Sequence, residues 1–420
     1  MMIYIIHAVI LGSVIYWSYK KPNSSELSGF FFPAMLFKIV AGLGVGVLYF
    51  FYYEIGDTIL YFEDAKKVSE VFYSSWVNYF RFLFGYDSME LNYIDNYRAL
   101  LFVKLISPIV IFTQNNYWIT SVYLSLMSFY TCWYLVLNIN KYYHQVITGG
   151  VVAFLFFPSI VFWSSGVLKE TISMSIIVVL SVFFIQIVND EFKLPVRKVV
   201  LALLLVFLLF QLKYYYAAIF LIATLPTLIF KLFSKYFKIK NTVFIWLMLL
   251  LCFTVGVSYL HPNLSLQRVM DVVIANNKLY NQHVDLSKTI YYYNLENTLI
   301  SIFINAPLAL VSALFRPFVF EVGSVLQFML GVENVFLVAL FLVFPFRKIK
   351  IKKNEWPVIL TCFTYIIVLA VLLALSTPNF GTLSRYRISF LPFLVVLLSY
   401  NNPLLIKFFG LMVKIDVRKT

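Results

Sequence analysis

Long apolar runs separated by short polar stretches repeat along the whole chain. Eleven of these runs approach the length of roughly 17–22 residues that crosses about 30 Å of hydrocarbon as an α-helix. We therefore predict membrane spans at residues 2–17, 33–53, 117–138, 146–162, 167–188, 196–212, 214–232, 242–260, 325–345, 356–376 and 386–400. The pattern indicates an all-α, polytopic transmembrane bundle that forms a single membrane domain over residues 1–420.

Two further apolar segments are shorter or are interrupted by polar residues. Residues 99–112 contain Lys104, and residues 299–315 contain an asparagine and a proline. Such segments suit helices that re-enter the membrane or lie on its surface better than helices that cross it. We place them in two extracytoplasmic loops, 54–116, with an amphipathic helix, and 261–324.

The composition excludes a soluble globular protein. Hydrophobic residues make up 62% and charged residues only 12% of the chain, whereas average soluble domains contain about 25% charged residues. The first apolar run lacks the basic region and the small-residue cleavage site of a signal peptide, so we expect it to be retained as a span. All three cysteines lie inside apolar runs, which favours neither a disulfide framework nor a metal cluster.

Membrane topology explains the net charge of +14 better than a nucleic acid partner does. If the N-terminus lies outside and the two interrupted segments do not cross, every cytoplasmic loop carries Lys or Arg, as the positive-inside rule requires. These basic residues are Lys20, Lys21, Lys141, Lys193, Arg197, Lys198, Lys231, Lys235, Lys238, Lys240, the RKIKIKK stretch at 347–353, Lys407, Lys414, Arg418 and Lys419. We therefore predict a multi-pass protein of the bacterial cytoplasmic membrane, with its N-terminus outside and its C-terminus inside.

The first candidate site is the stretch EIGDTILYFEDA, which begins at the outer end of the second predicted span. In a helix, the spacing of Asp57, Tyr61 and Asp64 places all three side chains on one face. Carboxylates at this position can act as a general base or hold a divalent cation, so Asp57 and Asp64 are possible ligands of Mg²⁺ or Mn²⁺. The alternative is that the acids of this stretch are solvated loop residues that end the span.

The second candidate site is the stretch FPSIVFWSSGVLKETIS, in which Lys169 and Glu170 follow a glycine turn. A lysine in the first turn of a helix lies at the positive end of the helix dipole, so it needs an anionic partner. That partner can be Asp57, Glu170 or a phosphate. We expect Lys169 and Glu170 in a substrate site, and a structural salt bridge is the alternative.

Two stretches place arginines on the predicted extracytoplasmic side. NFGTLSRYR carries Asn379, Arg385 and Arg387, and LFRPFVFE carries Arg316 and Glu321. The positive-inside rule disfavours arginines on this side, and planar guanidinium groups suit phosphate or carboxylate. We expect these residues to bind a lipid headgroup or a lipid-linked substrate, although snorkelling of Arg385 and Arg387 to lipid phosphates is the alternative.

The stretch QLKYYY adds Lys213 and Tyr215 to the candidate substrate-binding residues. Its tyrosine rings can stack on sugar faces or belong to an interfacial aromatic belt. No P-loop, dinucleotide fingerprint or G-x-S-x-G motif occurs, so we expect no catalysis driven by nucleotides. Polyprenyl-phosphate-linked sugars fit the acids and cations best, because they combine a phosphate at the membrane with a polar body in water.

The stretches GDTILYFEDA, FFPSIVFWSSGVLKE, LFRPFVFE and NFGTLSRYR resemble the GT-C superfamily of membrane glycosyltransferases, including O-antigen-polymerase-like proteins of bacterial polysaccharide loci. The resemblance implies a GT-C-like fold, a polyprenyl-phosphate-linked sugar donor, a glycan or lipid-linked acceptor, a catalytic acid at Asp57 and often a divalent metal. The chain differs in lacking a paired acid motif and a C-terminal soluble domain. An oligosaccharide polymerase or ligase, a flippase or exporter of lipid-linked oligosaccharides and a non-catalytic assembly subunit are the alternatives.

Overall fold

The computed structural model describes residues 2–20, 27–237, 241–283, 289–321, 323–346, 351–352, 355–405 and 407. Within these ranges the chain is helical and has no β-strand, only an isolated bridge between Thr289 and Asn379. Seven of the described helical segments are long and apolar enough to cross a membrane, namely Ser28–Tyr53, Tyr117–Tyr142, Lys169–Asn189, Val196–Tyr236, Thr242–Tyr259, Val325–Phe346 and Trp356–Ser376. The all-helical prediction is confirmed, with fewer candidate spans than the eleven predicted.

The chain divides into two compact units, which are described separately. Unit 1 consists of Met1–Leu137, Phe154–Val179 and Leu204–Lys213, and unit 2 consists of Asn138–Ala153, Leu180–Leu203 and Tyr214–Thr420. Three long helices contribute residues to both units, namely α6 (Tyr117–Tyr142), α9 (Lys169–Asn189) and α10 (Val196–Tyr236).

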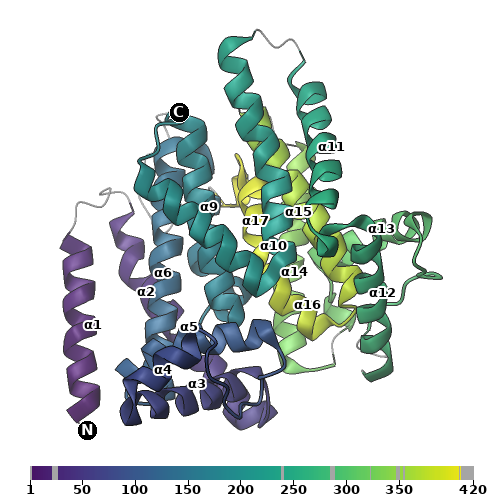
Figure 1. Ribbon diagram of the computed structural model, residues 1–420. Helices are drawn as coiled ribbons and strands as arrows, with labels where there is room; N and C mark the ends of the chain where they lie inside the picture. The colour runs from purple at the N-terminus through teal and green to yellow at the C-terminus, as the bar shows by residue number, and fades with distance from the viewer. Residues whose placement is uncertain are drawn as a thin grey trace. The chain divides into compact units, whose positions relative to one another are not determined.

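In unit 1, the helices α3 (Asp57–Ser74), α4 (Trp76–Leu83) and α5 (Tyr97–Phe112) follow the candidate span Ser28–Tyr53 and lie across its direction (Figure 1). The other helices that belong to this unit alone are α1 (Met2–Lys20), α2 (Ser28–Leu48) with its π-helical extension η1 (Tyr49–Tyr53) and α8 (Pro158–Trp163). Figure 1 shows α3, α4 and α5 lying across the direction of α2 and α6. The three helices pack through aromatic rings, among them Tyr61 of α3 against Phe102 of α5, with ring centroids 5.0 Å apart.

Unit 2 contains most of the C-terminal helices. They are α7 (Ile147–Val151), α11 (Thr242–Leu260), α12 (Leu266–His283), α13 (Leu299–Phe315), α14 (Val325–Val343), α15 (Trp356–Ser376), α16 (Phe380–Tyr386) and α17 (Leu391–Ser399). Helix α15 packs against α11, α12, α13 and α17. It therefore forms much of the core of this unit, and its inward face is lined by small and branched apolar residues such as Leu369, Ala370 and Leu373.

Several helices begin where the sequence offers a capping side chain. A Ser, Thr or Asn oxygen accepts a hydrogen bond from a backbone N–H of the first helical turn, which satisfies one of the donors that every helix start leaves open. The capping residues are Ser75, Asn96, Asn241, Thr298, Ser324 and Asn379.

Four predicted spans fall on kinked, interrupted or bent helices. The spans expected at 196–212 and 214–232 correspond to two helical stretches of α10 that meet at a kink at Lys213, so the chain leaves the helical conformation where the break was predicted. The span expected at 146–162 is interrupted by a π-helical segment (Val152–Phe156) and by Pro158, which begins a new helix. The last span, expected at 386–400, is a pair of helical segments bent by 65°.

The two segments that we expected not to cross form shorter helices, α5 with 16 residues and α13 with 17. The first predicted span corresponds to α1, a short apolar helix. Parts of the predicted basic loops lie outside the described residues, namely Lys21, Lys238, Lys240, residues 347–350 and 353, and the tail with Lys414, Arg418 and Lys419. Residues 284–288 and 322 of the second predicted extracytoplasmic loop also lie outside them.

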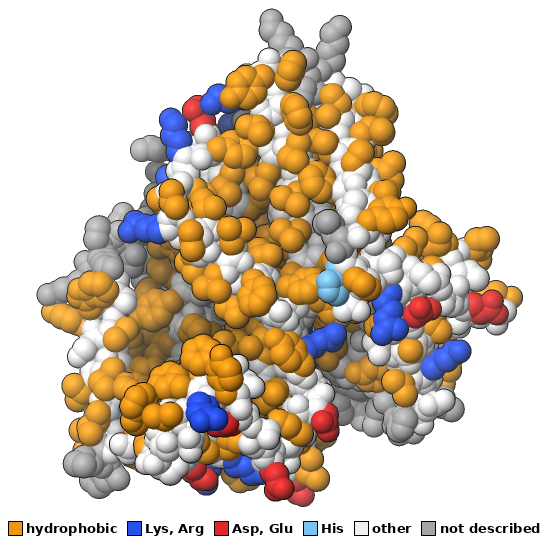
Figure 2. All heavy atoms as spheres, viewed as in Figure 1, with side chains coloured by type: hydrophobic (Ala, Val, Ile, Leu, Met, Phe, Trp, Pro, Cys, Tyr) orange, Lys and Arg blue, Asp and Glu red, His pale blue; other side chains and the backbone are white. Residues whose placement is uncertain are grey.

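The surface of α11 is almost entirely apolar. Leu247, Leu251 and Tyr259 are among its exposed side chains, and Figure 2 shows hydrophobic side chains over the region of α11. Only 11% of the residues in the apolar stretch of α11 are buried inside the protein. A helix of this length that exposes so much apolar surface is typical of a segment surrounded by lipid.

Candidate functional site

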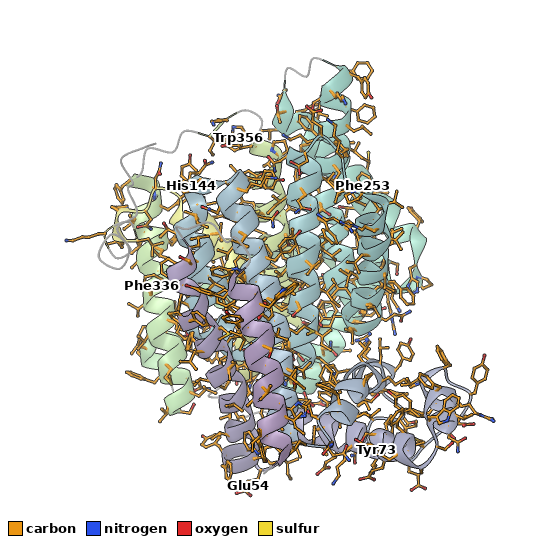
Figure 3. The ribbon with its side chains drawn as sticks, turned by 90° about the vertical axis from the view of Figure 1, so that its left-hand side faces the viewer. Glu54, Tyr73, His144, Phe253, Phe336 and Trp356 are labelled. Carbon is orange, nitrogen blue, oxygen red and sulfur yellow. The ribbon has the colours of Figure 1, made fainter. Side chains whose placement is uncertain are left out.

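The turn between α2 and α3 places Asp57 at the first residue of α3. Helix η1 ends at Tyr53, and Gly56 then adopts a φ of 157°. A Cβ at Gly56 would lie 2.6 Å from the ring of Tyr49, so the chain needs glycine to pass this ring. Glu54 lies in the same turn, at one end of the long helices (Figure 3). Asp57 therefore sits at a helix N-terminus, where the helix dipole stabilises a carboxylate.

The side chain of Asp57 is held by Tyr93, which no sequence motif identified. Tyr93 Oη donates a hydrogen bond to Asp57 Oδ1 at 3.0 Å. The loop that carries Tyr93 is itself held by Asp64, because Asn92 N and Asn92 Nδ2 donate to Asp64 Oδ1 at 2.9 and 2.8 Å. Tyr93 N donates to Asp64 Oδ2 at 3.0 Å. The buried Asp64 therefore positions Tyr93, and Tyr93 positions Asp57.

The hydrogen bonds to Asp64 do not favour this carboxylate as a metal ligand. Both oxygens of Asp64 accept hydrogen bonds from N–H groups, which occupy the positions that a cation would need. Among the described residues no three His, Cys, Asp or Glu side chains come together as metal ligands. Burial and then the negative charge of Asp57 raise the pKa of Tyr93, so its phenol remains a hydrogen-bond donor at neutral pH.

Lys169 belongs to the same cluster. Its Nζ lies 5.0 Å from the centroid of the Tyr61 ring, and this ring lies 4.8 Å from that of Tyr93. Tyr61 and Asp64 are both buried inside unit 1. Their burial agrees with the prediction that the two side chains share one face of the helix. An ammonium over an aromatic face is stabilised by about 0.5–2 kcal/mol.

Thr58 joins the start of α3 to the turn before α9. Thr58 Oγ1 donates to the carbonyl of Val167 at 2.7 Å. In this turn Gly166 has a φ of 71°, and its N–H donates to Ser125 Oγ at 3.0 Å. A Cβ at Gly166 would lie 3.0 Å from the carbonyl oxygen of Gly42, so the turn requires glycine. The two predicted motifs of unit 1 are therefore neighbours in space.

Glu170 forms a buried ion pair with Lys213. Lys213 Nζ lies 2.8 Å from Glu170 Oε1, and the two side chains are 7% and 1% exposed. Lys213 is also the residue at which α10 leaves the helical conformation, with φ −149° and ψ 78°. The alternative of a structural salt bridge in this motif is therefore realised at Glu170, with Lys213 as its partner.

Unit 2 contains a second group of predicted residues, centred on Arg316. Arg316 Nε lies 2.9 and 3.1 Å from the two carboxylate oxygens of Glu321, and Nη2 lies 2.5 Å from Oε1. Burial alone would raise the pKa of Glu321, but hydrogen bonds from Arg316 and from the N–H of Phe318 outweigh it and lower the pKa. The charge of Arg316 is therefore balanced within the protein.

Arg387 is buried in the same unit, with 1% of its surface exposed. Its Nη1 donates to Asn334 Oδ1 at 2.8 Å and to the carbonyl of Arg316 at 3.4 Å. Nη2 lies 3.9 Å from Glu333 Oε2, and Arg387 Nε and Nη2 have no hydrogen-bond partner in the described part of the chain. Arg385 is also buried. A buried guanidinium with N–H groups left over suits an anionic ligand.

The remaining two predicted residues of unit 2 have local contacts. Asn379 Oδ1 accepts a hydrogen bond from Thr382 N at 3.0 Å and so begins α16. Tyr215 is partly exposed, and its ring meets those of Tyr214 and Tyr216 edge-on, with centroids 5.6 and 4.8 Å apart. Asn379 therefore has a structural role, and Tyr215 is compatible with both sugar binding and an aromatic belt.

The predicted residues thus fall into one group in each unit. Unit 1 holds Asp57, Tyr61, Asp64, Lys169, Glu170 and Lys213, and unit 2 holds Tyr215, Arg316, Glu321, Asn379, Arg385 and Arg387. Sequence reasoning missed Lys38, which is 2% exposed inside α2 and donates to Ser164 Oγ at 2.5 Å. A lysine inside an apolar run is the signal that could have identified it.

Comparison of the chain with models of protein families, with curated proteins and with solved structures found no match.

Proposed function

We propose that the chain is an integral membrane glycosyltransferase of the GT-C type. It uses a polyprenyl-phosphate-linked sugar donor at the extracytoplasmic face of the bacterial cytoplasmic membrane, in the assembly of a surface polysaccharide or glycoconjugate. The observation that carries the proposal is the cluster of unit 1, in which Tyr93 holds the carboxylate of Asp57 and Lys169 lies over the neighbouring Tyr61. This carboxylate and this cation lie where an apolar span ends.

The proposed reaction assigns one role to each group. Asp57 accepts the proton of the acceptor hydroxyl, whose oxygen forms a bond to the anomeric carbon of the sugar. The bond between this carbon and the phosphate oxygen breaks, and the phosphate leaves with the electron pair. Lys169 stabilises the negative charge that develops on the departing phosphate. Tyr93 keeps the carboxylate of Asp57 oriented throughout.

The proposal also assigns a topology and a role to the arginines of unit 2. The N-terminus lies outside and the C-terminus inside, with about eleven crossings in which shorter apolar helices such as α1 complete the candidate spans. Arg387, with N–H groups left over after its protein contacts, is proposed to bind phosphate or carboxylate together with Arg385. The acceptor is a glycan or a lipid-linked sugar, so polymerase and ligase activities fall within the proposal.

The test is sugar transfer in proteoliposomes that contain a radiolabelled pool of polyprenyl-linked sugars. Asp57→Asn keeps the size of the side chain but removes the base, so we expect loss of product. Glu63→Gln is the matched control, because Glu63 is an exposed acid on the same helix, and we expect it to retain the wild-type rate. Equal rates for Asp57→Asn and wild type would refute the assigned role of Asp57.

A transporter of lipid-linked oligosaccharides is the second candidate function. The observation that favours it is Lys38, an ionisable side chain buried inside the candidate span that includes α2. The described residues offer this ammonium a serine hydroxyl and no carboxylate. Ionisable groups inside spans often mark substrate or proton pathways. A transport function would require that Lys38→Met abolish lipid movement while leaving the protein inserted.

A further inference from the structure

Helix α4 presents three different faces, which can be followed at about 100° of rotation per residue. One face, with Tyr79 and Phe82, is buried in unit 1. The next face carries Trp76, Val77, Phe80 and the C-capping Phe84 over an arc of about 100°. These apolar side chains are exposed, Trp76 by 65% and Phe84 by 75%. The third face carries the exposed polar residues Asn78 and Arg81.

The buried face fixes the rotation of α4 about its axis. Tyr79 Oη and Ser107 Oγ form a hydrogen bond of 3.0 Å. Lys104 Nζ donates to the carbonyls of Phe82 and Leu83 at 2.7 and 3.2 Å, so its ammonium neutralises the negative end of the α4 dipole. Because these contacts hold one side of the helix, the apolar face cannot turn inward. Its exposure is therefore a property of the folded unit.

The apolar face has the composition of a membrane–water interface. It combines a tryptophan with two phenylalanines, and Tyr73, at the end of α3, is also 55% exposed. The rings of Trp76 and Phe80 contact each other edge-on, with centroids 6.5 Å apart. On the neighbouring polar face Arg81 Nε lies 3.1 Å from Asp87 Oδ2. Figure 2 shows hydrophobic side chains beside a small charged group in the region of α4.

The position of α4 along the chain places it near the end of the spans of its unit. It belongs to the segment that begins after the candidate span Ser28–Tyr53 and ends before the candidate span Tyr117–Tyr142. Helices α3, α4 and α5 lie across these spans (Figure 1). Figure 3 shows the same group, with Tyr73 labelled, extending sideways from the long helices of unit 1. A helix in this position meets the bilayer surface.

We propose that α4 lies in the interfacial layer of the lipid bilayer. Trp76, Phe80 and Phe84 contact the acyl chains just below the headgroups, whereas Asn78 and Arg81 face the headgroups and water. The order of buried, apolar and polar faces around one helix matches a helix that touches protein, hydrocarbon and water along three sides. The occupant of the exposed face is lipid, because α4 belongs to the segment that joins two candidate membrane spans. This inference does not depend on the proposed enzymatic activity.

The first test uses nitroxide labels on the full-length protein in vesicles of equal parts phosphatidylethanolamine and phosphatidylglycerol. Labels are attached to Trp76→Cys, Phe80→Cys and Asn78→Cys in a background that lacks Cys252 and Cys362, while the buried Cys132 is retained. We expect labels at 76 and 80 to collide preferentially with oxygen, which partitions into lipid. We expect the label at 78, the matched control on the polar face, to collide preferentially with a water-soluble nickel chelate.

A second measurement needs no cysteine substitution. Vesicles that contain phosphatidylcholine brominated near the headgroup end of its chains quench tryptophans in contact with lipid. In Trp76→Phe, the fraction of the fluorescence that brominated lipid quenches should fall. The fraction that the nickel chelate or another aqueous quencher removes should not change.

Two results would overturn the proposal. Labels at 76 and 80 that collide with the nickel chelate as often as the label at 78 would place the apolar face in water. Labels that neither reagent reaches would show that another protein surface or a second copy of the chain covers it. Unchanged lipid quenching in Trp76→Phe would count against the proposal in the same way.

Discussion

The buried ion pair between Glu170 and Lys213 gives the clearest prediction of stability. Lys213→Met removes the ammonium but keeps most of the volume of the side chain. The carboxylate of Glu170, which is 1% exposed, then loses a partner at 2.8 Å. Removing one partner of a buried pair typically costs about 3–5 kcal/mol, because the remaining charge stays buried. We expect a loss of this size in the free energy of unfolding.

An exposed pair in the same chain provides the control. Lys193 Nζ lies 3.7 Å from Glu191 Oε2, and these side chains are 80% and 71% exposed. Exposed pairs of this kind contribute about 0–1 kcal/mol, so Lys193→Met should change the free energy of unfolding by less than about 1 kcal/mol. The two lysines thus differ chiefly in the burial of their pairs.

The measurement is unfolding by sodium dodecyl sulfate in mixed micelles, followed by tryptophan fluorescence, for wild type and both single variants. The double variant Glu170→Met with Lys213→Met completes the cycle. Replacing both charges by apolar groups of similar volume leaves no buried charge, so the double variant should be more stable than Lys213→Met alone. A loss of unfolding free energy in Lys213→Met no larger than in Lys193→Met, or a further loss in the double variant, would refute a stabilising buried pair.

Three further predictions follow from single contacts. Tyr93→Phe removes a hydrogen bond to a carboxylate, worth about 1.5–3 kcal/mol, so sugar transfer should fall by roughly tenfold or more while the protein still inserts; an unchanged rate would contradict this role. Gly166→Ala should cost about 1–2 kcal/mol in thermal unfolding because of its positive φ, whereas Gly12→Ala, with open space around it, should not destabilise. The pKa of Glu321 is lowered in the folded state, so its pair with Arg316 stabilises the fold. This contribution is complete above the unfolded-state pKa of about 4.3 and is lost as the pH falls through the folded-state pKa. The difference in melting temperature between wild type and Glu321→Gln should therefore shrink in acid; a constant difference would argue against the pair.

The apolar pattern predicted the helices well because it is a local property of the sequence. The segments at 117–138, 242–260, 325–345 and 356–376 closely match described helices. The prediction failed at 146–162 and 386–400, where the helix is interrupted or bent inside an apolar run. The predicted break at Lys213 agrees with the structure, because α10 is kinked at this residue, and the Lys213 ammonium meets Glu170 there.

The site was predicted less completely than the helices, because its contacts join distant parts of the chain. The helical spacing of Asp57, Tyr61 and Asp64 held, yet the roles of the two acids differ. Asp64 is bound by backbone and amide N–H groups of a loop 28 and 29 residues away. The sequence offered no signal for Tyr93, because a tyrosine in an irregular loop is selected only by the packing of that loop.

We propose that the chain transfers a sugar from a polyprenyl-linked donor. The most direct measurement follows a radiolabelled donor in proteoliposomes and records both new labelled product and labelled lipid that becomes accessible on the far side of the bilayer. We expect product with wild type and none with Asp57→Asn, as sugar transfer by this chain requires. Movement of labelled lipid across the bilayer without any product would contradict it and would assign the chain to transport.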